Sequence, residues 1–318
     1  MLEKIKSKLK IFQNQTFFMF LFLVLMMLVM GRLSPHFLTF ENLRQITVQA
    51  AVVLMMAAGM TFVIISRGID LSMGSVVALS SVTTAMFMTH INSAFLGFPM
   101  GLFIGAACGI VNGFMIGKLG IPPFVATFGM QGIARGITFV ITGGMPQFRV
   151  PAGVEVLGQN RILGIPISTI MVLLLYVMCF IILTRTRRGR YTYAVGSNRD
   201  AAFLSGINVT RHLIWVYMIA GLCAGLAGIT ELSRVGSGQP GAAIGWELDA
   251  IASVVLGGAS MAGGVGNIWG TFVGAFIIVT LRSGLNVLNV NAHWQLVAIG
   301  TIVVISVYAD LVRQKMRK

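Results

Sequence analysis

The stretch AAVVLMMAAGMTFVIISRGIDLSMGSVVALSS, residues 50–81, places one carboxylate, Asp70, between two long apolar runs. The first run is as long as a helix needs to cross most of a bilayer, and the second is rich in Ser and Gly. A charged side chain near hydrocarbon is costly, so Asp70 needs a specific role. The question is which kind of protein surrounds it.

The composition indicates a polytopic membrane protein. Charged residues make up 10% of the 318 residues and hydrophobic residues 56%, whereas about 25% charged residues are usual in soluble domains. A chain this apolar cannot bury its side chains in one water-soluble core, so lipid must be the solvent for many of them. Because no long polar stretch interrupts the pattern, residues 1–318 are expected to form a single transmembrane domain.

The net charge of +14 is concentrated in three short segments rather than spread over a surface. Excess Lys and Arg beside membrane spans marks the cytoplasmic side. No aromatic or groove-reading module accompanies the charge, so nucleic acid is not expected as a partner. The three segments contain Lys4, Lys6, Lys8 and Lys10; Arg185, Arg187, Arg188, Arg190, Arg199 and Arg211; and Arg313, Lys315, Arg317 and Lys318.

Apolar runs of roughly 20 residues predict an all-α fold of about ten transmembrane helices. Six spans separate the first basic segment from the second, and four separate the second from the third. Both numbers are even, so both termini are expected in the cytoplasm, and the first span is expected to be uncleaved. The third and eighth spans are rich in Ser, Thr and Gly and could be broken. The spans are expected at 16–33, 44–66, 70–90, 95–117, 121–143, 164–184, 212–232, 247–263, 267–287 and 292–311.

Two loops stand out in this topology. Residues 144–163 form the longest outer, periplasmic loop and are rich in turn residues. Residues 185–211 form the longest inner loop. Within it, DAAFLSGI (200–207) is expected to form a short helix capped by Asn198 or Asp200, which suits docking into a groove of a partner. A topology anchor is the simpler alternative for this loop.

A faint internal repeat is also present. GLFIGA (101–106) recurs as GTFVGA (270–275), and the small-residue stretch after Asp70 has a counterpart in ELDAIASVVLGGAS (247–260). The two copies are five spans apart, so spans 2–5 and 7–10 are predicted to form an inverted repeat, an architecture that recurs in transporters. Glycines every four residues over 101–113 predict close helix packing.

Signals of catalysis are missing from the sequence. It contains no HExxH, GxSxG, CxxC or Walker A pattern. The three cysteines have no metal-ligand spacing and are expected to pack as small apolar residues. The acidic residues are placed at span edges rather than at mid-depth, which disfavours an ion-coupled carrier. These edge acids are Asp70, Glu231, Glu247, Asp249 and Asp310.

Four stretches together resemble the permease subunits of bacterial ABC importers for monosaccharides, in the ribose-type branch. They cover much of the chain between about residues 40 and 310, and the combination is far more specific than any one Gly-rich piece. The stretches are GMTFVIISRGIDLSMGSVVAL (59–79), PPFVATFGMQGIARGITFVITGG (122–144), GRYTYAVGSNRDAAFLSGINV (189–209) and GWELDAIASVVLGGASMAGGVGNIWGTFVGA (245–275).

The resemblance implies a location in the bacterial inner membrane, contact with lipid and three kinds of protein partner. These are a cytoplasmic ABC ATPase, a periplasmic sugar-binding protein and a second permease, either a copy of this chain or a paralogue. ATP hydrolysis would occur on the ATPase, so this chain is not expected to be an enzyme or to need a cofactor. Residues 196–207 would form the helix that couples to the ATPase. The coupling residues implied are Gly196, Asn198, Asp200, Ala201, Ala202, Gly206 and Ile207.

One departure concerns Ser66 and Arg67, which precede GIDLS where family members often have a small residue or a second glycine. For Asp70, at the expected cytoplasmic mouth of span three, the main interpretation is a helix cap through the amides of Ser72 and Met73, worth about 1 kcal/mol. A gating contact with Arg67 or another basic residue, and direct contact with sugar, remain alternatives.

The sequence therefore predicts a permease that imports a monosaccharide by alternating access. An ion-coupled secondary sugar carrier and an integral-membrane enzyme are the alternatives from other classes. Candidate residues of the path or gate are Asp70, Ser72, Asn112, Glu247, Asp249 and Asn286.

Overall fold

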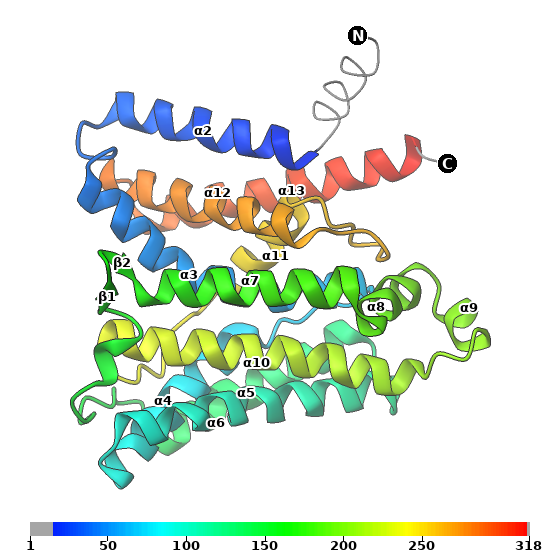
Figure 1. Cartoon of the computed structure of the whole chain (residues 1–318), viewed down its shortest axis with the longest axis horizontal. Coiled ribbons are helices and arrows are strands. Elements are labelled where there is room, and N and C mark those ends of the chain that lie inside the picture. Colours follow the sequence, from blue (N-terminus) through cyan, green and yellow to red (C-terminus); the bar gives the residue numbers. More distant parts are fainter. Residues whose placement is uncertain (1–14, 317–318) are drawn as a thin grey trace.

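The computed structural model describes residues 15–316, and the chain is almost entirely helical (Figure 1). A short 3-10 turn (Val154–Val156) and a two-stranded antiparallel hairpin, β1 (Arg161–Ile162) and β2 (Ile165–Pro166), interrupt the helices. The helices are α2 (Gln15–Leu33), α3 (Phe40–Ile65), α4 (Met73–Ile91), α5 (Ala94–Gly117), α6 (Pro123–Thr142), α7 (Ile167–Arg185), α8 (Arg187–Ser197), α9 (Arg199–Leu204), α10 (Val209–Val235), α11 (Trp246–Leu256), α12 (Ile268–Val287) and α13 (Ala292–Met316).

Within residues 15–316, eight helices are long and apolar enough to cross a membrane: α2 to α7, α10 and α12. The prediction of a polytopic all-α fold is confirmed, and each of the ten expected spans coincides with a helix. The expected extent of the eighth span, 247–263, is wrong. Helix α11 has 11 residues and is about 16 Å long, roughly half of the hydrocarbon thickness. Helix α13 has 25 residues, which is as many as a membrane span needs.

The long helices run side by side, and their connections gather at two opposite ends (Figure 1). We call the end that carries α8 and α9 the α9 face, and the end that carries β1 and β2 the hairpin face. Helix α2 begins and α13 ends at the α9 face, as an even number of crossings requires. The terminal basic segments, residues 4–10 and 313–318, and Asp310 lie outside the residues whose side chains are described.

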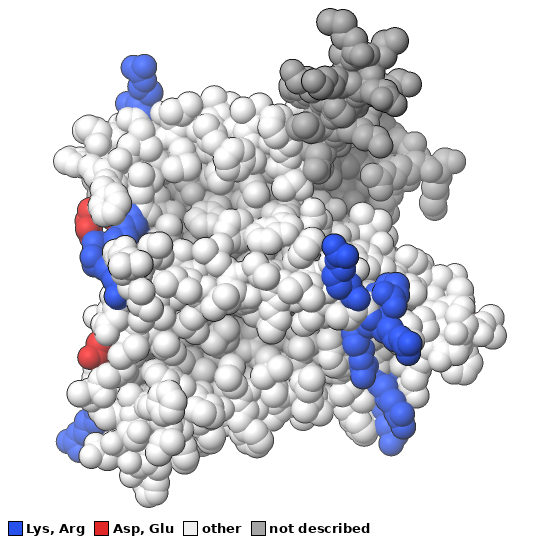
Figure 2. All heavy atoms as spheres, viewed as in Figure 1, with Lys and Arg blue, Asp and Glu red and all other residues white. Residues whose placement is uncertain are grey.

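Charged side chains keep to the two ends of the bundle on the face drawn in Figure 2. Lys and Arg gather at one end, over α8, and both signs of charge lie at the other end, while the sides of the described helices are uncharged. Many exposed side chains of α2, α5 and α6 are large and apolar, including Phe22, Phe103 and Val140. Lipid is the solvent that suits this surface.

The helices pack as two copies of one pattern. In the first copy, α4 packs against α5, α6 and α10; in the second, α11 packs against α12, α13 and α3. Exchanging α3–α6 with α10–α13 converts one set of contacts into the other. The chain enters α4 from the α9 face and enters α11 from the hairpin face (Figure 1), so the copies run in opposite directions. This arrangement agrees with the predicted inverted repeat.

Glycines hold the two copies together where α5 meets α10. A Cβ atom on Gly105 would collide with the carbonyl oxygen of Gly221, and one on Gly109 with the carbonyl oxygen of Tyr217. A Cβ on Gly225 would collide with the carbonyl oxygen of Gly101. The predicted role of the glycines at four-residue spacing in close helix packing is confirmed, because two helix backbones touch with no side chain between them.

We predict that Gly221→Ala destabilises the fold by about 1–3 kcal/mol, because the added methyl group meets backbone that cannot rotate away. Gly300→Ala is the matched control, since a Cβ there has nothing within 4 Å. Thermal unfolding of the purified protein in detergent should show a lower midpoint for the first variant only. Equal midpoints would mean that α5 and α10 can move apart without loss of stability.

Candidate functional site

Helices α4 and α11 both begin inside the bundle. The carbonyl oxygen of Ile69, just before α4, accepts hydrogen bonds from the hydroxyls of Tyr217 (3.4 Å) and Thr127 (3.3 Å). Tyr217 lies about eight residues into α10, so its backbone is about 12 Å from the start of that helix. A Cβ on Gly74, in the first turn of α4, would collide with Oε2 of Glu247, in the first turn of α11. The amino ends of the two helices therefore meet in the interior.

Asp70 is fully enclosed at this meeting point, with 2% of its surface exposed. Its Oδ1 accepts hydrogen bonds from the amide of Ser72 (2.9 Å) and from the hydroxyl of Ser72 (2.6 Å). The predicted bond to the Ser72 amide is present, but the interpretation of Asp70 as the cap of α4 is wrong. Ser72 is the N-cap residue, no side chain caps α4, and the described contacts of Asp70 include no bond to the amide of Met73. The expected position at a mouth of the protein is wrong, because the chain turns inward after α3 before α4 begins.

Ser72 and Asn112 extend the contacts of Asp70 across to α5. The side-chain amide of Asn112 donates to the Ser72 hydroxyl at 2.9 Å. Asn112 is 1% exposed, and its Oδ1 has no hydrogen-bond partner among the described residues. Three candidates chosen from sequence thus form one chain of hydrogen bonds, which ends in a free acceptor. A hydroxyl group of a ligand, or a water molecule, could satisfy that acceptor.

The structure separates Arg67 from Asp70. Arg67 is exposed at the α9 face, and the described side chains include no ion pair between these two residues. The alternative of a gating contact between them is therefore not supported by this conformation. Arg67 has φ +62°, a left-handed backbone that is uncommon for residues other than Gly.

Glu247 and Asp249, the acids of α11, are also inside the bundle, with 6% and 2% of their surfaces exposed. The expectation that they lie at a span edge is wrong, because α11 starts where the chain has already passed inward from the hairpin face. Glu247 accepts a hydrogen bond from Gln131 of α6 at 3.1 Å, and its Oε2 has no partner among the described residues. Asp249 forms an ion pair with Arg282 of α12 at 2.8 Å.

Four polar residues in this region were missed by sequence reasoning: Gln49, Gln131, Arg135 and Arg282. Arg135 donates to the carbonyl oxygens of Pro240 (2.7 Å) and Ala242 (2.9 Å). Gln49 and Arg282 help to line a cavity of about 90 Å³ beside Asp249. The available signal was a cation or amide within an apolar run, which is as informative as an acid.

Asn286 does not join the other candidates. It is exposed near the hairpin end of α12, where its Oδ1 accepts a hydrogen bond from Gln295 at 2.7 Å. The structure therefore brings together five of the six path candidates around the beginnings of α4 and α11 and leaves this one apart.

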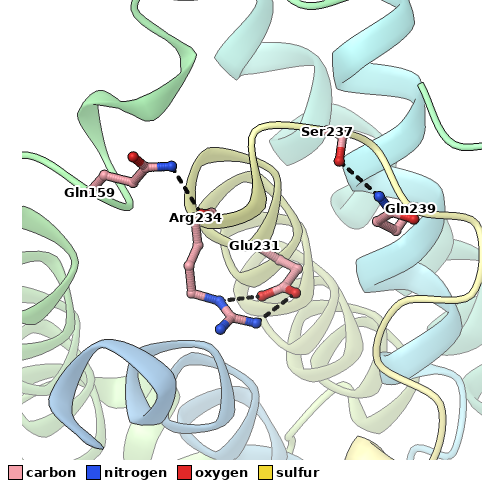
Figure 3. A network of polar contacts seen from close by, with 5 residues as sticks. All are labelled: Gln159, Glu231, Arg234, Ser237 and Gln239. Atoms are coloured by element: carbon pink, nitrogen blue, oxygen red, sulfur yellow. Dashed lines mark hydrogen bonds and ion pairs between the residues drawn. The ribbon is translucent and has the colours of Figure 1, made fainter. Parts of the chain in front are cut away.

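The hairpin face is held by a polar network between α10 and the loop over 144–163 (Figure 3). Arg234 forms an ion pair with Glu231 at 2.8 Å, and its carbonyl oxygen accepts a hydrogen bond from Gln159 at 3.1 Å. Gln239 donates to Ser237 at 2.8 Å in the chain that turns inward toward α11. Beside this network lies a surface cavity of about 580 Å³, lined by Met86, Thr89, His90 and residues 146–149.

At the α9 face, the expected short helix is confirmed as α9, Arg199–Leu204. Of the two possible caps, Asn198 is used: its Oδ1 accepts a hydrogen bond from the amide of Ala201 at 2.9 Å. Ala202 is buried beneath the helix, whereas Phe203 and Leu204 are 68% and 84% exposed. Helix α9 therefore offers two exposed apolar side chains at the end of the protein where Lys and Arg gather.

Gly196 packs this segment against the end of α3, where the inward turn over 66–72 begins. A Cβ there would collide with the carbonyl oxygen of Ile65, the last residue of α3. Next to it, the hydroxyl of Tyr193 in α8 donates to the carbonyl oxygen of Gly266 at 3.0 Å, and burial raises the pKa of this phenol. The phenol therefore keeps its proton and this contact at neutral pH. A displacement of α8 and α9 would reach the end of α3 directly.

Comparison with known proteins shows the family to which the chain belongs. The sequence profile of the family described as "Branched-chain amino acid transport system / permease component" matches residues 42–307. The chain belongs to this permease family. No solved structure matches the permease.

Similar proteins of known name cover nearly the whole permease. The ribose import permease protein of Bacillus subtilis is 42% identical over 293 residues, 92% of this chain and 91% of its own. The D-allose transport system permease protein of Escherichia coli K12 is 38% identical over 92% of this chain and 90% of its own. The galactose/methyl galactoside import permease protein of Haemophilus influenzae is 34% identical over 100% and 99%. The resemblance derived from the four sequence stretches is confirmed.

We predict that Ser72→Ala lowers the stability of the permease by about 1–3 kcal/mol, because it removes a bond to Asp70 and leaves the buried amide of Asn112 without its acceptor. Thr184→Ala is the control, since its hydroxyl bonds only to its own helix at an exposed position. Thermal unfolding in detergent measures both. A Ser72→Ala midpoint no lower than that of the control would contradict a tightly bonded interior site.

Proposed function

We propose that this permease is the transmembrane subunit of an ATP-driven importer that carries a monosaccharide across the bacterial inner membrane. The observation that carries the proposal is helix α9, a capped helix with Phe203 and Leu204 exposed beside the inward turn that leads to Asp70. An exposed apolar pair at the end of a membrane protein suits a groove on a soluble partner. In this proposal the partner is a separate ATPase, on which hydrolysis takes place.

A monosaccharide is the substrate class that the similar proteins support. Their names specify ribose, D-allose and galactose or methyl galactoside. The family description names branched-chain amino acids, but the three named relatives share 34–42% identity with almost the entire chain. The polar interior also suits a polyol, because the free acceptors of Asn112 and Glu247 can accept hydrogen bonds from hydroxyl groups.

The α9 face is the cytoplasmic side in this proposal. The basic segment over 185–211 supports this orientation through the positive-inside rule, and both termini would then be cytoplasmic. The hairpin face would meet a periplasmic sugar-binding protein, with the ordered loop over 144–163 and its cavity of about 580 Å³ as the docking surface. A second permease copy or a paralogue would complete the path.

Alternating access would act on the two inward turns. The turn over 66–72 leads inward from the α9 face to the amino end of α4, and the turn over 236–245 leads inward from the hairpin face to the amino end of α11. Movement of α9 would shift the first turn through the close contact of Gly196 with Ile65. The substrate can shift the balance between the two states only if it binds them with different affinities.

The first experiment is co-purification of the tagged chain with its partners, followed by reconstitution in liposomes. An ABC ATPase in stable stoichiometry, with sugar-dependent ATP hydrolysis, is the expected result. The alternative of an ion-coupled carrier predicts uptake by the chain alone that stops when the ion gradient is collapsed.

Gly206→Val should lower sugar transport and sugar-stimulated ATP hydrolysis together, by about tenfold or more. Gly206 follows α9 with φ +81°, a conformation that Val avoids, so α9 would be reoriented. Gly120→Val is a matched control, because Gly120 also has a positive φ, +71°, open surroundings and a place in a connection at the α9 face.

Reconstituted vesicles of both variants measure the two rates. Loss of transport with fully retained, sugar-dependent hydrolysis in Gly206→Val would contradict the docking role of α9. An equal loss of transport in Gly120→Val would mean that backbone strain, and not a change in the docking of α9, explains the result.

A further inference from the structure

A second basic feature lies beside α9. Arg67, at the head of the inward turn, and Arg199, the first residue of α9, line one cavity of about 440 Å³ at the α9 face. The remaining lining residues are Pro123, Ser197, Asn198 and Asp200. The cavity therefore joins three parts of the chain: the turn before α4, the start of α6 and the coupling segment.

Among the described residues, neither guanidinium in this cavity forms an ion pair. The ion pairs found among the described residues are Arg44 with Glu41, Arg234 with Glu231 and Arg282 with Asp249. Nε of Arg199 is buried and has no hydrogen-bond partner in the part of the chain that the structure describes. Asp200 contributes one carboxylate to the lining but lies in no ion pair with either arginine. The lining thus carries one net positive charge and two planar donors that are free to bind a carboxylate.

Arg67 has a backbone conformation that is strained for arginine, which indicates that its side chain has a role at this position. Its φ of +62° is in the left-handed region, where glycine has no steric penalty and arginine does. Its Cβ is packed against Gly263 of the connection between α11 and α12, and the side chain is exposed at the α9 face. Glycine would suit the backbone better, so the guanidinium is the reason to expect arginine here.

We propose that the cavity between Arg67 and Arg199 is a second docking point for the ATPase, which inserts an acidic side chain into it. This inference rests on the proposed function and extends it, because it adds the turn that carries Asp70 to the coupling surface. The ATPase would then hold α9 through Phe203 and Leu204 and hold the inward turn through Arg67. Charge complementarity favours an acidic partner at this basic face.

The test measures the affinity of the permease in nanodiscs of uncharged lipid for the ATPase that co-purifies with it. Arg67→Gly removes the guanidinium and relieves the backbone, so its thermal midpoint should equal or exceed that of the unaltered chain. Its affinity for the ATPase should be about tenfold lower at low salt, with a weaker dependence on salt concentration. Arg67→Lys keeps the charge without the planar fork and should lie between the two.

Arg211→Ala is the matched control, because it removes one exposed positive charge from the same face outside the cavity. An Arg67→Gly affinity equal to that of the unaltered chain, or a loss no larger than that of Arg211→Ala, would overturn the proposal. So would a loss that appears only in nanodiscs containing anionic lipid, since the cavity would then hold a lipid headgroup. If the unaltered chain bound no ATPase, the proposed function itself would fail before any variant was compared.

Discussion

Backbone N–H and C=O groups inside a bilayer must be paired within the protein, and this constraint shapes the centre of the molecule. Two non-helical segments, 66–72 and 236–245, pass into the bundle and cannot pair their own polar groups as a helix does. Side chains from neighbouring helices pair them instead: Tyr217 and Thr127 bond to Ile69, and Arg135 bonds to Pro240 and Ala242. Polar residues in otherwise apolar helices are therefore structural requirements of the two turns.

The close glycine contact between α5 and α10 is a second consequence of the need to pair the inward turns. Helices α5 and α10 approach until backbone touches backbone, as the contact of Gly105 with Gly221 shows. Only this approach brings Asn112 of α5 and Tyr217 of α10 close enough to bond to the turn before α4. Packing between long helices and pairing of the turn are thus coupled. A change in the relative position of the helices would alter the hydrogen bonds around Asp70.

This coupling gives a physical form to the proposed transport cycle. The turn over 66–72 contacts the coupling segment at one end, where Gly196 meets Ile65, and holds Asp70 and Ser72 at the other. A connection only a few residues long would transmit a movement of α8 and α9 at the α9 face to the interior. The inverted copy provides the same kind of connection from the hairpin face to Glu247 and Asp249. Two such connections, one per face, suit a path that opens to each side in turn.

Hydropathy and charge alone were enough to identify a polytopic membrane protein, to locate the helices at the ten expected spans and to mark α9 as a capped surface helix, because each of these depends on neighbouring residues. The depth of Asp70, Glu247 and Asp249 depended on tertiary structure. A hydropathy pattern measures how long an apolar run is, but it does not reveal that the chain turns inward before a helix begins. That the first turns of α4 and α11 meet, and that Gln131, Arg135 and Arg282 complete the site, follows from contacts between residues more than thirty positions apart.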